Sequence, residues 1–229
     1  MLTQELLDFF FPKRCLGCGR AGFFICPDCS LKLPYLENQF CSVCNEPSVG
    51  GFTHLRCQSR YAPDRFLSLF VYKGLAQNLV KELKYGKVTA LRKVVNRLVL
   101  EFLEENGIDL GEKTLITFVP IHQFKLWERG FNQSQLLAEE VGKSLNLRVE
   151  SFLEKVKETR SQTEFKKEDR AQNVKGSLAL KKVIDKILQG QDVLLIDDVF
   201  TTGATLLECA NLLKRGGVRF LYLLTLCKD

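Results

Sequence analysis

The chain has 229 residues, of which 45% are hydrophobic and 26% charged, and its net charge is +6 at pH 7. This composition excludes a largely disordered chain, and the lack of any apolar run of about eighteen residues excludes a transmembrane helix. The N-terminus has neither the basic start nor the cleavage site of a signal peptide, so we expect a cytoplasmic protein. The positive charge is too small to indicate a nucleic-acid partner by itself.

Cysteine residues are concentrated in the first quarter of the chain. Seven of the nine cysteines precede residue 60, and they form three Cys-x-x-Cys pairs and one pair in which His54 precedes Cys57. A two-residue spacer lets both side chains point at one metal ion, and two such pairs complete the tetrahedral shell that zinc prefers. Pairing in chain order predicts two closed structural zinc sites; an interleaved pairing fits the spacing as well, and a redox-active module is the alternative. The expected ligands are Cys15, Cys18, Cys26 and Cys29 in one site and Cys41, Cys44, His54 and Cys57 in the other.

The rest of the chain alternates apolar strands with amphipathic helices. Strands are predicted over 66–72, 114–119, 147–152, 192–196 and 218–226, and helices over 74–84, 89–105, 131–145 and 204–215. This alternation is typical of a parallel sheet with helices on both faces. The polar segment 154–176 has no periodicity, and we interpret it as a cover that closes over a site.

The densest chemical signal is the run Val-Leu-Leu-Ile-Asp-Asp-Val-Phe-Thr-Thr-Gly-Ala-Thr over residues 193–205. An apolar strand ends in Asp197 and Asp198, and a loop rich in threonine leads into a helix. Ligands of open parallel sheets bind beyond the carboxyl ends of the strands, and the N-terminus of a helix suits a phosphate. Two carboxylates suit adjacent hydroxyl groups or a hydrated Mg²⁺ ion. Together these features predict a phosphorylated ribose as the ligand.

These thirteen residues resemble the signature of the type I phosphoribosyltransferases, which bind phosphoribosyl pyrophosphate (PRPP). The cysteine module, the run Val119-Pro120-Ile121-His122 and the run Arg129-Gly130-Phe131-Asn132-Gln133 resemble the ComF family over essentially the whole chain. The resemblance implies an α/β fold of the type I phosphoribosyltransferase kind, a parallel sheet flanked by helices, over residues 61–229. It also implies that residues 1–60 form an N-terminal helix and a double zinc-ribbon module.

The same resemblance implies a PRPP site that uses Mg²⁺. Asp197 and Asp198 would hold the ribose hydroxyls, directly or through water and Mg²⁺. The expected 5-phosphate cradle is Thr201, Thr202, Gly203, Ala204 and Thr205. The expected pyrophosphate contacts are Pro120, Ile121 and His122 through the backbone, with Arg129 and Lys84 supplying positive charge. A structural role for His122 and a plain surface charge at Arg129 are the alternatives.

For function, the resemblance implies a PRPP-binding protein that acts in DNA uptake (natural competence), in the cytoplasm at the inner face of the membrane. Single-stranded DNA or DNA-uptake proteins would be its partners. One alternative is an active phosphoribosyltransferase, whose acceptor the sequence does not identify. The other is a zinc module that binds a partner protein or a nucleic acid, and catalysis itself is left open.

Overall fold

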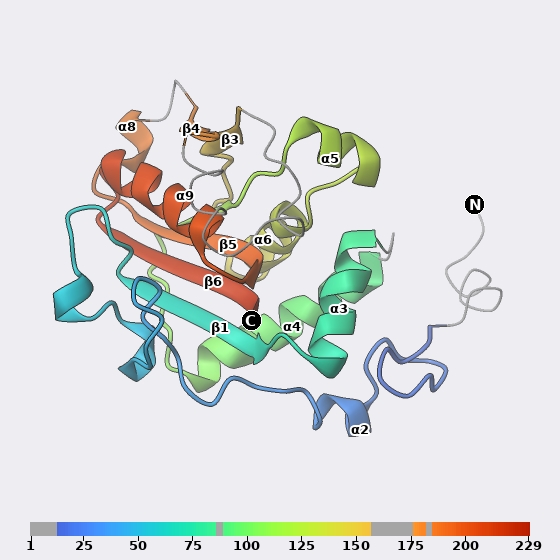
Figure 1. Cartoon of the computed structure of the whole chain (residues 1–229). Helices are drawn as coiled ribbons and strands as arrows, with labels where there is room; N and C mark the ends of the chain where they lie inside the picture. The colour runs from blue at the N-terminus through green and yellow to red at the C-terminus, as the bar shows by residue number, and fades with distance from the viewer. Residues whose placement is uncertain (1–12, 86–88, 157–175, 182–184) are drawn as a thin grey trace.

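The fold is built on one parallel sheet. The computed structural model describes residues 13–85, 89–156, 176–181 and 185–229. Four parallel strands lie in the order β1-β6-β5-β2 (Figure 1). They are β1 (Arg65–Val71), β2 (Leu115–Phe118), β5 (Asp192–Phe200) and β6 (Phe220–Lys228). Four of the five predicted strands are thus confirmed, and β5 runs four residues further than predicted, to Phe200.

Helices cover both faces of this sheet, which explains why its strands are almost continuously apolar. The first face carries α3 (Gly74–Tyr85), α4 (Thr89–Glu105) and α6 (Gln133–Leu145). The second face carries α9 (Ala204–Arg215), the hairpin of β3 (Leu153–Lys155) with β4 (Leu178–Leu180), and the short α8 (Asp185–Leu188). Successive residues of β5 alternate accordingly, with Leu194 facing the first set and Leu195 the second. Among the described residues, no helix combines the length and apolarity needed to cross a membrane.

Several elements differ from the prediction, which includes neither the β3–β4 hairpin nor α8. Residues 147–152 do not form a strand but meet β2 at a single parallel bridge, Ile116 with Val149, because the chain then turns toward β3. Helix α5 (Gln123–Arg129) was not predicted, since its large apolar residues are exposed and leave no inward stripe to detect. Its ends are well capped: the His122 side chain accepts a hydrogen bond from Phe124 N, and Gly130 adopts φ +79°. The predicted N-terminal helix and most of the predicted cover (154–176) lie outside the described residues.

The chain that follows the first cysteine pairs covers the outer edge of β1 (Figure 1, blue to cyan). An open edge leaves backbone N–H and C=O groups unpaired. The buried Gln39 side chain pairs with one residue of this edge: its Nε2 donates to Ser68 O (3.0 Å), and its Oε1 accepts from Ser68 N (2.8 Å). Antiparallel bridges also pair Tyr35 with Phe70 and Phe52 with Arg65, so this segment contacts β1 both before and after Ser68. The cysteine-rich N-terminal segment is therefore anchored to the sheet, and the boundary at residue 60 stays a prediction.

Replacing Gln39 with alanine tests this anchoring. The substitution leaves the buried N–H and C=O of Ser68 without partners, so we expect the free energy of unfolding to fall by about 1–3 kcal/mol. Urea denaturation measures the change. Asn38→Ala is the matched control, because Asn38 is an exposed amide one residue away and should change stability by less than about 0.5 kcal/mol. Equal losses for the two variants would contradict the anchoring role.

Candidate functional site

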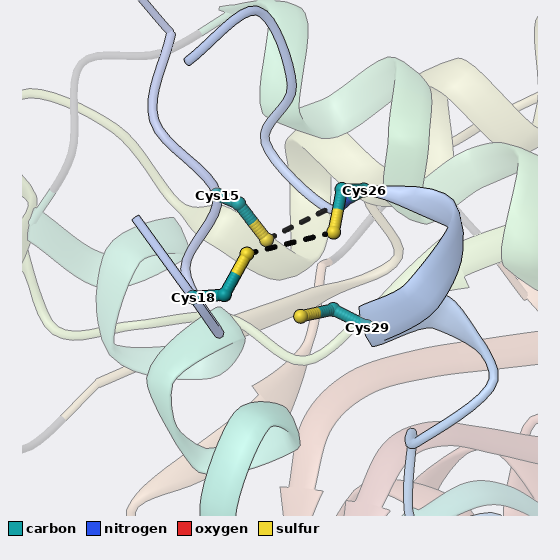
Figure 2. Close-up of side chains that lie close together, drawn as sticks. All are labelled: Cys15, Cys18, Cys26 and Cys29. Carbon is teal, nitrogen blue, oxygen red and sulfur yellow. Dashed lines mark hydrogen bonds between the residues drawn. The ribbon is translucent and has the colours of Figure 1, made fainter. Parts of the chain in front are cut away.

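The N-terminal module brings its metal-binding side chains together in two clusters. One contains Cys15, Cys18, Cys26 and Cys29, and the other contains Cys41, Cys44, His54 and Cys57. Within each cluster the ligand atoms all lie within 4.8 Å of one another. Figure 2 shows the four sulfur atoms of the first cluster converging on a common centre, with Cys18 Sγ 3.6 Å from Cys26 Sγ. The clusters follow chain order, so the structure groups the ligands without interleaving.

The histidine of the second cluster is oriented to act as a ligand. His54 Nδ1 lies 3.3 Å from Cys44 Sγ, while Nε2 lies 3.1 Å from Pro47 O. A carbonyl oxygen only accepts, so Nε2 carries the proton and Nδ1 keeps its lone pair for the metal. Each cluster offers four sulfur or nitrogen ligands, the set and number that zinc takes in structural sites. These closed shells leave no position for a substrate.

Zinc content tests the assignment of the two clusters. We expect the purified chain to hold two zinc ions, and Cys26→Ser, which removes a fully buried ligand, to hold about one and to melt at a lower temperature. Plasma emission spectroscopy measures the metal. Cys227→Ala is the control, because Cys227 is a buried thiol outside both clusters and its loss should leave both ions in place. Two ions in Cys26→Ser would disprove the first site.

A second candidate site lies at the carboxyl end of β5, where side chains of α6 donate hydrogen bonds to two carboxylates. Ser134 Oγ donates to Asp197 Oδ1 (2.9 Å), and Gln133 Nε2 donates to Asp198 Oδ2 (3.1 Å). The start of α6 is itself held in place, because Asn132 caps the helix and donates through Nδ2 to Val119 O (2.9 Å). Sequence reasoning quoted Asn132 and Gln133 only for a family resemblance and missed Ser134. The sequence did offer a signal for Ser134: small polar residues begin a predicted helix at the sheet edge where the two acids lie.

Charge in this region is balanced by a lysine from α3. Lys84 Nζ lies 2.9 Å from Asp198 Oδ2. Burial lowers the pKa of Lys84, but the Asp198 carboxylate outweighs this effect, so the pKa is raised overall. Burial and the negative charge of Asp198 together raise the pKa of Asp197 to about 7. Asp197 is therefore a carboxyl group that a nearby cation would help to ionise.

A pocket of about 150 Å³ opens beside these charges. Its lining consists of Lys84, Asp197, Asp198, Val199, Thr201, Thr202, Gly203, Ala204, Thr205 and Leu206. Gly203 begins α9 with φ +75°, and a Cβ there would come 2.4 Å from Phe200 Cζ, so only glycine fits. The first turn of α9 faces the pocket and offers the backbone N–H groups that helices leave unpaired. The structure thus brings together the predicted loop, both acids and Lys84.

Four other predicted residues do not line this pocket. Pro120 is buried, Ile121 is half-buried, and the His122 side chain is used to cap α5. The His122 side chain thus has a structural role, and the expected backbone contacts of residues 120–122 with a pyrophosphate stay a prediction. Arg129 does not contact the acids directly: its Nη1 donates to Gln133 Oε1 (3.3 Å), and Gln133 in turn donates to Asp198.

Two cations near the pocket were missed from the sequence. Burial lowers the pKa of Lys125, and the charges of Arg129 and Lys84 lower it further. Burial likewise lowers the pKa of Lys155, at the end of β3, and Lys125 adds to the effect. Lys125 lies on the helix that was not predicted, and Lys155 belonged to a segment interpreted as polar cover. Lys84 contacts Asp198 directly, whereas Lys125 and Lys155 interact with the charges of Asp198 and Asp197 from further away.

The raised pKa of Asp197 makes a prediction about stability. Its usual value is 3.8, so ionisation costs the folded chain stability as pH rises from about 4 to about 7. Asn at this position still accepts the Ser134 hydrogen bond but carries no charge. In Mg²⁺-free buffer we expect Asp197→Asn to raise the free energy of unfolding by about 1–3 kcal/mol more at pH 8 than at pH 5. A gain of the same size at both values would contradict the argument.

Comparisons with known proteins agree with this arrangement. Residues 6–59 match the double zinc ribbon domain, and residues 132–229 match the phosphoribosyl transferase domain. DNA utilization protein YhgH of Escherichia coli O6:H1 is 29% identical over 222 residues, covering 93% of each chain. Competence protein F of Haemophilus influenzae is 29% identical over 213 residues, covering 89% of this chain and 85% of that protein.

A solved structure of the allosteric regulatory enzyme of purine biosynthesis matches with a TM-score of 0.39 and 16% identity, over 64% of this chain and 30% of that chain. The two domain matches follow the order of the two sites described above, zinc ribbon first and paired acids second. The relatives match over nearly the whole length of the chain. The chain therefore combines a double zinc ribbon with a phosphoribosyltransferase domain and is similar over most of its length to competence protein F, in agreement with the resemblance to the ComF family.

Proposed function

We propose that this protein binds PRPP, or a closely related phosphorylated ribose, together with Mg²⁺, and that it acts in DNA uptake or utilisation. One observation carries the proposal: two carboxylates, a lysine and the N-terminus of α9 line the same pocket of about 150 Å³. Phosphate, hydroxyl groups and a divalent cation need different partners, and this pocket presents all of them side by side.

The 5-phosphate would bind at residues 201–205. Backbone N–H groups at the start of α9 favour an anion, and the helix dipole adds to this preference. Hydroxyl groups of Thr201, Thr202 and Thr205 supply further donors. Gly203 is required for this loop conformation, because its φ is +75° and a side chain at this position would collide with Phe200. With its 5-phosphate bound at this loop, the ribose would lie beside the carboxylates of Asp197 and Asp198.

Asp197 and Asp198 fit a divalent cation as well as ribose hydroxyls. Carboxylate oxygens are the ligands that Mg²⁺ takes, and the like charge that raises the pKa of Asp197 would be offset by a bound cation. When bound, Mg²⁺ would neutralise negative charge on the pyrophosphate. The remaining phosphate oxygens would bind Lys84, which contacts Asp198, and Arg129, which contacts Gln133. Lys125 and Lys155 would add positive charge to the region.

The proposed role in DNA uptake is supported by the relatives, whose names are DNA utilization protein and competence protein F. We propose that the protein acts in the cytoplasm, at the inner face of the membrane, with single-stranded DNA or DNA-uptake proteins as partners. The zinc ribbon (1–60) would support the phosphoribosyltransferase domain (61–229) by covering the edge of its sheet. PRPP would then be a ligand whose presence the protein reports to its partners.

Calorimetric titration of the zinc-loaded chain with PRPP, with and without Mg²⁺, tests the proposal. We expect binding that requires Mg²⁺ and that weakens at least about tenfold in Asp197→Asn/Asp198→Asn, since hydrogen bonds to charged groups contribute about 1.5–3 kcal/mol each. Asp192→Asn is the matched control, because Asp192 starts the same strand but pairs with Arg219 away from the pocket. Equal affinity in all three proteins would disprove a PRPP site here, and so would an absence of binding.

A further inference from the structure

Helix α5 carries a pair of exposed aromatic rings that the proposed PRPP site does not use. The Phe124 side chain is 56% exposed and Trp127 is 83% exposed. Their ring centroids lie 6.3 Å apart, and a spacing of three residues places both on one face of the helix. Large apolar side chains gathered in the open in this way mark a binding surface.

The inner flank of α5, next to these rings around the helix, is basic and faces the paired acids, since Arg129 Nη1 donates to Gln133 Oε1 and Gln133 Nε2 donates to Asp198 Oδ2. Lys125 and Arg129 are four residues apart, and the charges of Arg129 and Lys84 both act on Lys125. The Arg129 guanidinium lies 5.3 Å from the centre of the Tyr85 ring, at the end of α3. Tyr85 is 70% exposed and adds a third ring to the group. We call Tyr85, Phe124, Lys125, Trp127 and Arg129 the α5 surface; α3 and α5 lie at the same end of the molecule (Figure 1).

Rings beside cations have the chemistry that binds single-stranded nucleic acids, where bases stack on aromatic side chains and phosphates meet lysine and arginine. The rings are open to solvent rather than enclosed, so one small aromatic molecule would bury little area on them. A strand can place several bases on them in succession, whereas a duplex keeps its base faces stacked inside. The charge of the α5 surface favours this polyanion over an apolar protein segment.

We propose that the α5 surface binds single-stranded DNA, with bases stacked on Phe124 and Trp127 and phosphates beside Lys125 and Arg129. The choice of DNA rests on the proposed function, but the surface does not depend on PRPP binding. Because Arg129 of this surface is linked through Gln133 to Asp198 in the pocket lining, bound DNA would lie next to the phosphorylated ribose.

Tryptophan fluorescence gives a direct test, since Trp127 is the only tryptophan in the chain. The full zinc-loaded protein is titrated with oligothymidine of about twenty nucleotides at about 0.15 M salt. We expect a solvent-exposed emission spectrum before titration, quenching by the oligonucleotide, and weaker quenching by a duplex of the same length. Blue-shifted emission in the DNA-free protein would overturn the proposal, because it would mean that the chain or a second copy already covers Trp127.

Binding of labelled oligothymidine, followed by anisotropy, assigns the residues. Trp127→Ala and Phe124→Ala should each weaken binding by about fivefold or more. Phe23→Ala is the matched control, because Phe23 is a 44% exposed aromatic residue in the zinc ribbon and should leave the affinity unchanged. Lys125→Gln should reduce the slope of log affinity against log salt by about 0.7. Unchanged affinity in both aromatic variants would overturn the proposal and leave a protein partner as the occupant.

Two cross-checks separate this proposal from the PRPP proposal. Trp127→Ala should keep its affinity for PRPP, and Asp197→Asn/Asp198→Asn should keep its affinity for oligothymidine. PRPP binding without DNA binding would overturn the α5 surface alone. DNA binding that depends on Trp127 in a chain that ignores PRPP would support the surface and disprove the proposed ligand of the pocket.

Discussion

The paired carboxylates at the end of β5 impose the strongest constraint on this structure. Two acids next to each other in a partly desolvated place repel each other, and the chain offsets the repulsion with donors from two other elements. Ser134 and Gln133 come from the start of α6, and Lys84 comes from the last turn of α3. Because these donors must converge, α3, α6 and the loop before α9 are held at one edge of the sheet, where the pocket forms. Asp197 still keeps a raised pKa, which is the stability cost of a site poised for a cation.

The zinc ribbon solves a different physical problem. β1 is the last strand on its side of the sheet, and its outer edge would be open if nothing covered it. A short loop-rich segment cannot fold on its own apolar area, so two metal clusters hold it in shape while Gln39 and its neighbours pair with the edge. Cys15, Cys26 and Cys29 are buried in the same core as α3, which also carries Lys84. Loss of the first metal cluster would therefore disturb the helix that supplies a cation to the acids.

Helix α5 joins the two proposed activities in space. Its inner side contributes Lys125 and Arg129 toward the acids, and its outer side carries the exposed rings. A ligand in the pocket and a strand on the α5 surface would share these cations, so each would alter the electrostatic field that the other meets. This shared group of cations is a physical route by which a phosphorylated ribose could influence DNA binding without a change of fold.

The sequence alone determined the local features of this protein. Spacing of Cys-x-x-Cys pairs indicated two metal clusters, apolar runs indicated β1, β2, β5 and β6, and the order of acids, threonines and glycine indicated the pocket loop. These signals are readable because each depends on residues close together in the chain. The predictions that failed concern elements whose structure depends on contacts with distant parts of the chain. Residues 147–152 look like a strand but meet β2 at only one bridge, and α5 has no inward apolar stripe, so periodicity could not reveal it.

Only the tertiary structure decided which distant side chains meet. It grouped the metal ligands in chain order, brought Ser134 and Gln133 to the acids, and used the His122 side chain as a helix cap. It also brought Lys84 of α3 into contact with Asp198 of β5. No local pattern encodes such meetings, because they follow from how the sheet and its helices pack. The sequence determined which chemical groups are present, and packing determined which of them act together.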